Sequence, residues 1–375
     1  MAGIYLHIPF CKQACSYCDF HFSTVLSRKT EMVDAICVEL ELSKSYIDNE
    51  EITTVYFGGG TPSLLNENDV VALLDKIHST YTLSDDVEIT LEANPDDLTK
   101  SKLIELKRAG INRLSIGIQS FFDEHLKFMN RAHNSVEAEN CVKFAQDVGF
   151  NNLSIDLIFG YKGLTEEQWY TNLKKATAFN VAHISSYALT IEPKTALAYL
   201  EKKDPTLLPP DKRVNEQFFI ADKHLIESGY NHYETSNYSK LGHQSKHNTS
   251  YWQGKKYLGV GPSAHSFNTV SRSWNVSNNL KYLKGISEGK INRSIEKLTV
   301  KNQINESILI GLRTIIGLNM KEIELRFGQS IVRQILKESK PFMAINQLKL
   351  EGDFLTIPKE HWVVTDYISS LLFVD

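Results

Sequence analysis

The chain has 375 residues, of which 42% are hydrophobic and 23% charged, the composition of an ordinary globular protein. Its formal net charge of −4 at pH 7 supplies no overall basic field, so we expect no nucleic-acid partner. The N-terminus lacks the pattern of a signal peptide, and no run approaches the roughly 18 apolar residues of a membrane span. The five cysteines, an odd number, argue against a disulfide framework. We therefore expect a cytoplasmic protein with at most peripheral membrane contact.

Short apolar runs alternate with helical patterns through the first half of the chain. Strands are predicted over residues 3–8, 52–57, 87–92, 113–118, 153–159 and 182–189, and helices over 29–47, 67–79, 98–109, 122–130, 135–148 and 165–179. Strand–helix units in series predict a parallel sheet with right-handed crossovers. Since the predicted strands are fewer than the eight of a closed barrel, we expect an α/β fold in the form of an open, partial (β/α)6 barrel.

The second half of the chain has a different pattern. Residues 204–211 are rich in proline and look like a linker, a helix is predicted over 212–228, and the stretch to about 275 has little periodicity. Three helical patterns after 295 precede a hairpin over 348–357, a combination typical of a winged-helix module. We expect a barrel over 1–205, an extension over 206–294, and a smaller C-terminal domain over 295–375 with a lid or docking role.

Three of the five cysteines, Cys11, Cys15 and Cys18, directly follow the first predicted strand. Their spacing would also place three core cysteines on one helix face, but Pro9 and the polar residues between them favour a loop. Thiolates at this density suit zinc or an iron–sulfur cluster. Zinc usually takes four protein ligands, whereas three cysteines leave one iron of a four-iron cluster open. We therefore favour a [4Fe–4S] cluster. Cys37 and Cys141 have helical spacing and are expected in the core.

Unusual polar and glycine residues follow the other predicted strands at the same end: Gly58, Gly59, Gly60 and Thr61, then Glu92, Gln119, Arg131 and Asp156. Because the C-terminal ends of parallel strands meet at one edge, we expect these residues to surround the cysteines. Glycines admit the close approach of an ammonium group, and a guanidinium suits a carboxylate. Each of these features has a simpler explanation when it is considered alone. A tight turn explains the glycines, and a surface ion pair explains Arg131 or Asp156.

The spacing Cys11-x₃-Cys15-x₂-Cys18 followed by Gly58–Thr61 resembles the radical S-adenosylmethionine (SAM) superfamily. The resemblance implies that SAM binds the open iron through its amino and carboxylate groups. It also implies that the cluster passes an electron to SAM and cleaves it to a 5′-deoxyadenosyl radical. This reaction requires an electron donor that reduces the cluster. The residues that would contact SAM are Gly59, Gly60, Thr61, Glu92, Gln119, Arg131 and Asp156.

Longer segments are similar to the oxygen-independent coproporphyrinogen III oxidases over roughly residues 3–275; they are Tyr5–Cys11, Phe57–Pro62, Gly117–Ser120, Asn130-Arg131 and Asp156–Gly160. In that subfamily the counterparts of Tyr5 and Tyr17 also contact SAM. Two features depart from it. Phe20 stands where the oxidases have a further cysteine, and Tyr5 lies close to the start of the chain, where the oxidases carry an N-terminal arm. Together with His247-Asn248-x-x-Tyr251-Trp252, these departures resemble the HemW heme chaperones.

The segment His247–Trp252 has chemistry suited to heme, because imidazole and phenolate are axial ligands of heme iron and an indole offers a flat face. A packed corner is the simpler explanation of a histidine and two aromatic residues. The resemblance implies heme contacts from His247, Asn248, Tyr251 and Trp252. His243 and His265 flank this segment and are alternative ligands. We expect a chaperone that transfers heme to an acceptor hemoprotein, such as a respiratory enzyme. The alternative is an oxidase that converts coproporphyrinogen III to protoporphyrinogen IX with SAM.

Overall fold

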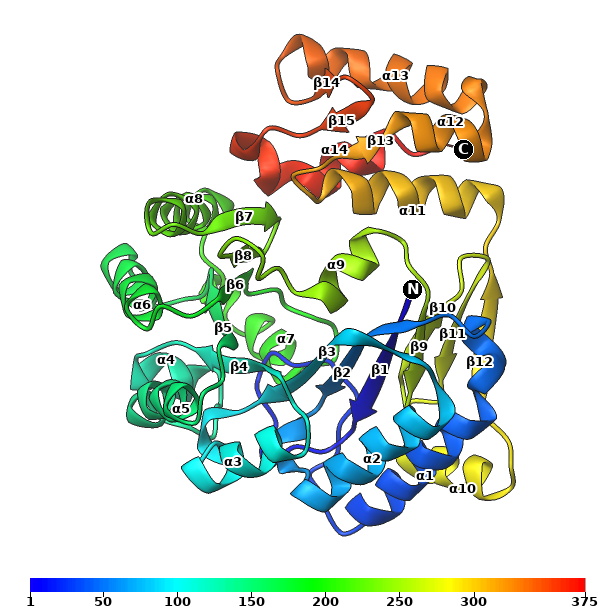
Figure 1. Cartoon of the computed structure of the whole chain (residues 1–375). Helices are drawn as coiled ribbons and strands as arrows, with labels where there is room; N and C mark the ends of the chain where they lie inside the picture. The colour runs from blue at the N-terminus through cyan, green and yellow to red at the C-terminus, as the bar shows by residue number, and fades with distance from the viewer. Residues whose placement is uncertain (375) are drawn as a thin grey trace.

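A twelve-stranded sheet runs through most of residues 1–374, the part of the chain that the computed structural model describes (Figure 1). Its strand order is β12-β11-β10-β9-β1-β2-β3-β4-β5-β6-β8-β7, so the sheet has two separate edges and is open. The parallel centre consists of β1 (Ala2–Ile8), β2 (Ile52–Gly59), β3 (Leu83–Ala93), β4 (Arg113–Gln119), β5 (Asn152–Phe159) and β6 (His183–Ala188). The predicted partial barrel is confirmed.

Amphipathic helices cover the outside of this sheet: α1 (Lys29–Leu42), α2 (Glu67–Thr80), α3 (Lys100–Arg108), α4 (Asp123–Phe128), α5 (Ser135–Asp147), α6 (Glu166–Ala178) and α8 (Asp211–Glu227) (Figure 1). In α2 the buried residues Val70, Leu73, Leu74 and Ile77 form one stripe that faces the strands. The helix predicted over 29–47 is shorter, because α1 ends at Leu42 and a 3₁₀ turn follows. Within residues 1–374, no helix has both the length and the apolar character needed to cross a bilayer.

Residues 230–275 contain more regular structure than their weak periodicity indicated. They form β7 (Asn231–Glu234), β8 (Asn237–Ser239), α9 (Lys246–Trp252), β9 (Tyr257–Val260), β10 (His265–Phe267) and β11 (Ser271–Asn275). These strands have three to five residues, too few for an alternating pattern to stand out. Strand β9 pairs in parallel with β1 and extends the barrel beyond the six predicted strands. The His247–Trp252 segment is a helix, which Ser245 caps by accepting a hydrogen bond from the Asn248 N–H.

The C-terminal module has its own hydrophobic core (Figure 1). After α10 (Asn279–Ser287) and β12 (Arg293–Lys297), it contains α11 (Val300–Leu312), β13 (Leu318–Asn319), α12 (Met320–Phe327), α13 (Gln329–Ala344), β14 (Lys349–Glu351), β15 (Phe354–Thr356) and α14 (Thr365–Leu371). Helices with a small antiparallel sheet agree with the predicted winged-helix-like arrangement. The module joins the barrel at β7, where the Ile315 N–H donates to the Tyr233 carbonyl at 3.1 Å.

Candidate functional site: a cavity at the strand ends

A cavity of about 500 Å³ lies inside the barrel and reaches the C-terminal ends of its strands. Except for Tyr5, every residue predicted to bind the cluster or SAM lines it: Cys11, Cys15, Tyr17, Cys18, Gly59, Gly60, Thr61, Glu92, Gln119, Arg131 and Asp156. Tyr5 lies behind the cavity wall, where its ring stacks with that of Tyr56 at a centroid distance of 6.1 Å. The fold therefore brings together residues that are far apart in the sequence.

Backbone hydrogen bonds hold the loop that carries the three cysteines. The Cys11 N–H donates to the Ser23 carbonyl at 3.1 Å, and the Ser16 N–H donates to the Met129 carbonyl at 3.1 Å. The first bond closes the loop on itself, and the second ties it to the end of α4. These two bonds fix the position of the loop relative to β1 and α4.

Two polar side chains face the cysteine sulfurs. The Thr61 hydroxyl donates to Cys11 Sγ at 3.3 Å, and Arg131 Nη1 donates to Cys15 Sγ at 3.3 Å. Burial raises the pKa of the Cys11 thiol and raises that of Cys18 to about 11, so binding of a metal must displace these protons. Within residues 1–374, no three His, Cys, Asp or Glu side chains converge on a single metal-ion position. A four-iron cluster binds each cysteine to a different iron atom.

The guanidinium of Arg131 is held from several sides. Its Nη2 donates to Asn94 Oδ1 at 2.6 Å and to the Gly117 carbonyl at 2.8 Å, while its Nε has no partner among residues 1–374. Asn94 was missed by the sequence analysis. It follows Glu92 by two positions, so the alternation of a strand would have placed both side chains on the same face.

The three glycines at the end of β2 are required because β1 and the residues after it lie too close for a side chain. A Cβ on Gly58 would lie 2.8 Å from the Tyr5 ring, and one on Gly60 would lie 2.6 Å from the Phe10 carbonyl oxygen. Gly59 has φ +105°, which strains any side chain, and a Cβ there would lie 2.7 Å from the His7 ring. Glycine at these positions lets β2 pack closely against β1 and the cysteine loop. This close packing restricts the residue type more strongly than a tight turn would.

Two half-buried carboxyl groups face the cavity. Glu92 accepts a hydrogen bond from the Tyr56 hydroxyl at 2.8 Å, and burial raises its pKa to about 7. Asp156 accepts from the Ser115 hydroxyl at 3.1 Å, and burial raises its pKa as well. A carboxylate that is costly to ionise in the empty protein is stabilised when a cationic group arrives. The pair is therefore suited to a ligand that carries positive charge.

Unpaired polar atoms around the cavity indicate that its ligand is polar. Gln119 Oε1, Arg131 Nε and Arg113 Nε are buried and lack hydrogen-bond partners within residues 1–374. Gln119 also has φ +63°, an uncommon backbone conformation for a non-glycine residue. Thiols, amide, guanidinium and carboxyl groups are what a cluster and the amino-acid and ribose parts of SAM require. The residues present fit these groups.

The residues predicted to bind heme do not line a single cavity. The His247 ring is buried, with Nδ1 2.8 Å from the Thr54 hydroxyl and Nε2 2.8 Å from the Tyr251 hydroxyl. It stacks on Tyr56 at a centroid distance of 4.8 Å, and burial lowers its pKa to about 3. Both ring nitrogens are engaged, so His247 can ligate heme iron only if a hydrogen bond opens. Asn248, the next residue, lines the cavity of about 500 Å³ at the strand ends, which we call the cofactor cavity.

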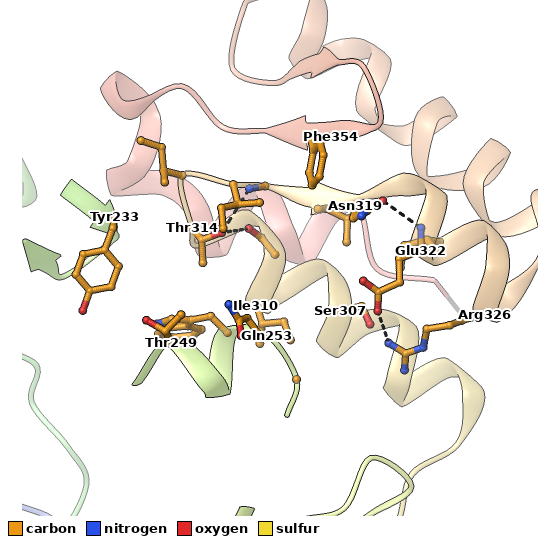
Figure 2. Close-up of a pocket in the computed structure, with 18 of the residues that line it drawn as sticks. Tyr233, Thr249, Gln253, Ser307, Ile310, Thr314, Asn319, Glu322, Arg326 and Phe354 are labelled. Carbon is orange, nitrogen blue, oxygen red and sulfur yellow. Dashed lines mark hydrogen bonds and ion pairs between the residues drawn. The ribbon is translucent and has the colours of Figure 1, made fainter. Parts of the chain in front are cut away.

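Trp252 faces a second cavity, of about 280 Å³, between α9 and the C-terminal module. Figure 2 shows Thr249 of α9 and Gln253, the residue just after that helix, below Phe354, with Ile310 of α11 beside Gln253. The Nε1 of Trp252 has no partner within residues 1–374. His243 and His265, the alternative ligands, are absent from the walls of both cavities in this described part of the chain.

Comparisons with known proteins define the class of protein. The sequence model of the radical SAM superfamily matches residues 5–176, and that of the HemN C-terminal domain matches residues 298–366. The solved structure of coproporphyrinogen III oxidase (HemN) from Escherichia coli shares the fold, with a TM-score of 0.85 and 21% identity, covering 100% of this chain and 90% of that chain. The chain is therefore a radical SAM protein with a HemN-like fold.

Comparison with curated proteins narrows the family to which the chain belongs. Heme chaperone HemW of Bacillus subtilis (strain 168) is 35% identical over 334 residues, 88% of each chain. Heme chaperone HemW of Escherichia coli (strain K12) is 37% identical over 265 residues, 70% of this chain and 69% of the relative. The chain belongs to the HemW family.

The position of each cysteine predicts the effect of replacing it. We expect Cys15→Ser to abolish cluster assembly, because Cys15 lines the cavity and faces Arg131. We expect Cys141→Ser, a matched change at a buried thiol of α5, to retain the cluster and lose only some stability. Iron and sulfide content and visible absorbance after anaerobic reconstitution measure both. Loss of the cluster in the Cys141 variant would contradict the ligand assignment.

The buried charge of Glu92 predicts a cost to stability. The folded state holds this proton more tightly than the unfolded state, so the free energy of unfolding should fall as pH rises from about 4.5 to about 7. At pH 8, without SAM, Glu92→Gln should therefore stabilise the protein by an amount on the order of 2 kcal/mol, while weakening SAM binding. Urea unfolding at pH 5 and pH 8 measures this. Glu31→Gln, on the exposed side of α1, is the control and should show no such difference.

Proposed function

We propose that this protein is a heme chaperone that binds a [4Fe–4S] cluster through Cys11, Cys15 and Cys18, binds SAM in the same cavity, and delivers heme to an acceptor hemoprotein. The observation that carries the proposal is the 35% identity to a HemW heme chaperone over 88% of both chains. The cluster and SAM, when bound, supply one-electron chemistry. An electron donor is needed only where SAM is cleaved.

The composition of the cavity mouth supports a chaperone over an oxidase. Phe20 lines the cavity where the oxidases have a further cysteine, and its side chain is 63% exposed. Phe22 and Tyr187 line the same cavity. A phenylalanine at this position adds no further thiolate beside the three cysteines of the cavity.

Of the places that the segment His247–Trp252 reaches, the second cavity is the best suited to hold the porphyrin. Trp252 supplies an indole, and Ile310 and Phe354 supply apolar wall. Ile315 and Ile316 line the same cavity and are at least half exposed, so it is open to solvent. A volume of about 280 Å³ is at the low end for a ligand pocket. We infer that the cavity holds one edge of the porphyrin, an arrangement that allows release to an acceptor.

One experiment separates the two functions. The cluster is reconstituted anaerobically, hemin is titrated while the Soret band is followed, and formation of protoporphyrinogen IX from coproporphyrinogen III is assayed on the same sample with SAM and a reductant. We expect stoichiometric heme binding without turnover, followed by transfer of heme to an apo-hemoprotein. Robust oxidative decarboxylation would instead support the coproporphyrinogen III oxidase alternative.

Variants of α9 test where heme binds. Trp252→Ala should weaken heme binding by roughly fivefold to tenfold, the loss of one aromatic contact. Trp274→Ala, in β11 and outside both cavity walls as described for residues 1–374, is the matched control and should retain the wild-type affinity.

The same titration decides the role of His247. A shifted or weakened Soret band in His247→Ala, with cluster absorbance intact, would show that His247 leaves Thr54 and Tyr251 to ligate iron. An unchanged Soret band would assign His247 to the barrel interior. Unchanged heme affinity in both the Trp252 and the His247 variants would exclude α9 as the heme site.

A further inference from the structure

Asn94 is the first residue after β3 and lines the cofactor cavity. Its Oδ1 accepts a hydrogen bond from Arg131 Nη2 at 2.6 Å, and its Nδ2 donates to the Thr61 hydroxyl oxygen at 3.2 Å. Arg131 Nη1 in turn donates to Cys15 Sγ at 3.3 Å. The Thr61 hydroxyl donates to Cys11 Sγ, also at 3.3 Å. One amide therefore connects two donors that reach two of the three predicted cluster ligands.

The direction of each of these bonds follows from the chemistry of the groups. A guanidinium has only donors, so the atom of Asn94 that faces Arg131 must be the amide oxygen. The amide nitrogen then faces Thr61 and donates to it. Since a hydroxyl has a single hydrogen, a Thr61 oxygen that accepts from the amide keeps that hydrogen for Cys11. Asn94 thus directs both donors toward sulfur.

The backbone of Asn94 is held as well. Pro95 follows it, and a proline favours an extended conformation in the residue before it; Asn94 has φ −90° and ψ 143°. The Asn94 N–H donates to Ser63 Oγ at 3.2 Å. The turn that begins at Pro95 is tied to the cysteine loop, because Lys12 Nζ donates to Asp96 Oδ2 at 2.8 Å. The amide therefore has a defined position beside the loop that carries the thiols.

We propose that Asn94 is a positioning residue that sets the two hydrogen bonds to the sulfurs of Cys11 and Cys15. Hydrogen bonds to sulfur are among the features that set the reduction potential of an iron–sulfur cluster. They raise this potential, because they stabilise the reduced state, which carries the more negative charge. The inference rests on the proposed cluster for the effect on a potential, whereas the two contacts belong to this chain alone.

The first test needs no cluster. Crystal structures of the apoprotein and of its Asn94→Ala variant, kept anaerobic so that the thiols stay reduced, show where the two donors lie. In the wild type we expect both 3.3 Å contacts with sulfur. In Asn94→Ala we expect Arg131 and Thr61 to move out of hydrogen-bond distance of the sulfurs. Unchanged contacts in Asn94→Ala would overturn the proposal.

The second test measures the reduction potential of the cluster-loaded protein without SAM. The sample is titrated anaerobically with a low-potential chemical reductant, and electron paramagnetic resonance follows the reduced cluster. We expect Asn94→Ala to make reduction about tenfold less favourable, which lowers the potential of a one-electron couple by about 59 mV. Asn66→Ala, which removes the side-chain cap of α2, is the matched control and should retain the wild-type potential. Equal potentials in the wild type and in Asn94→Ala would contradict the proposal.

An isosteric variant separates positioning from packing, and it also serves if Asn94→Ala does not fold. The carboxylate of Asn94→Asp still accepts from Arg131, but it has no N–H for Thr61 and attracts the hydroxyl hydrogen away from Cys11. Thr61→Val should therefore lower the potential in the wild-type background and leave it unchanged in the Asn94→Asp background. Because each comparison is made within one background, the effect of the added charge cancels. Equal shifts in both backgrounds would show that Asn94 does not direct the hydroxyl, and the proposal would fail.

The outcomes also separate this proposal from the proposed function. If the wild type assembles no cluster, the proposed function fails, and the apoprotein structures alone decide the role of Asn94. If the cluster assembles and its potential does not respond to Asn94→Ala, the role of Asn94 fails, and the proposed function stands.

Discussion

The close contact between β2 and the loop after β1 is the constraint on which the site depends. Gly58, Gly59 and Gly60 admit no side chain, because Tyr5, His7 and the Phe10 carbonyl occupy the space that a Cβ needs. This contact fixes the cysteine loop above the strand ends. It also places Thr61 against Cys11, so the position of one thiol is set by the same turn. The remaining wall of the cavity includes residues of β3, β4, β5 and β6, which pair in parallel in that order.

The barrel is closed at its other end by α9. His247 contacts Thr54 near the start of β2, and a Cβ on Gly3 near the start of β1 would lie 3.3 Å from the His247 ring. A histidine with both nitrogens bonded and a depressed pKa is a neutral structural group in this conformation. The helix has Asn248 on the cofactor cavity and Trp252 on the second cavity, so a short segment forms a wall of both.

The barrel and most of its site could be predicted from the sequence, because each predicted strand is long enough to show an apolar run and the polar residues follow at its end. Arg113 and Asn94 were missed for a physical reason. A buried charge at the start of a strand looks like a surface residue, and Asn94 acts through Arg131, which is distant in sequence. The helix α9 was not foreseen either, since seven residues complete too few turns for helical periodicity to appear. The burial of His247 depends on β1 and β2, which no local pattern reveals.

A short series of side-chain contacts joins Glu92 to α9, the helix that lines both cavities. Glu92 accepts a hydrogen bond from Tyr56, and Tyr56 stacks on His247 of α9. His247 is in turn hydrogen-bonded to Tyr251 of the same helix. A cation that binds near Glu92 therefore acts on a group only two contacts from the helix that carries Trp252. The proposed function requires heme to be held and then released, so the heme site must respond to another event. In this fold α9 is the wall that the two cavities share, with Asn248 on one side and Trp252 on the other.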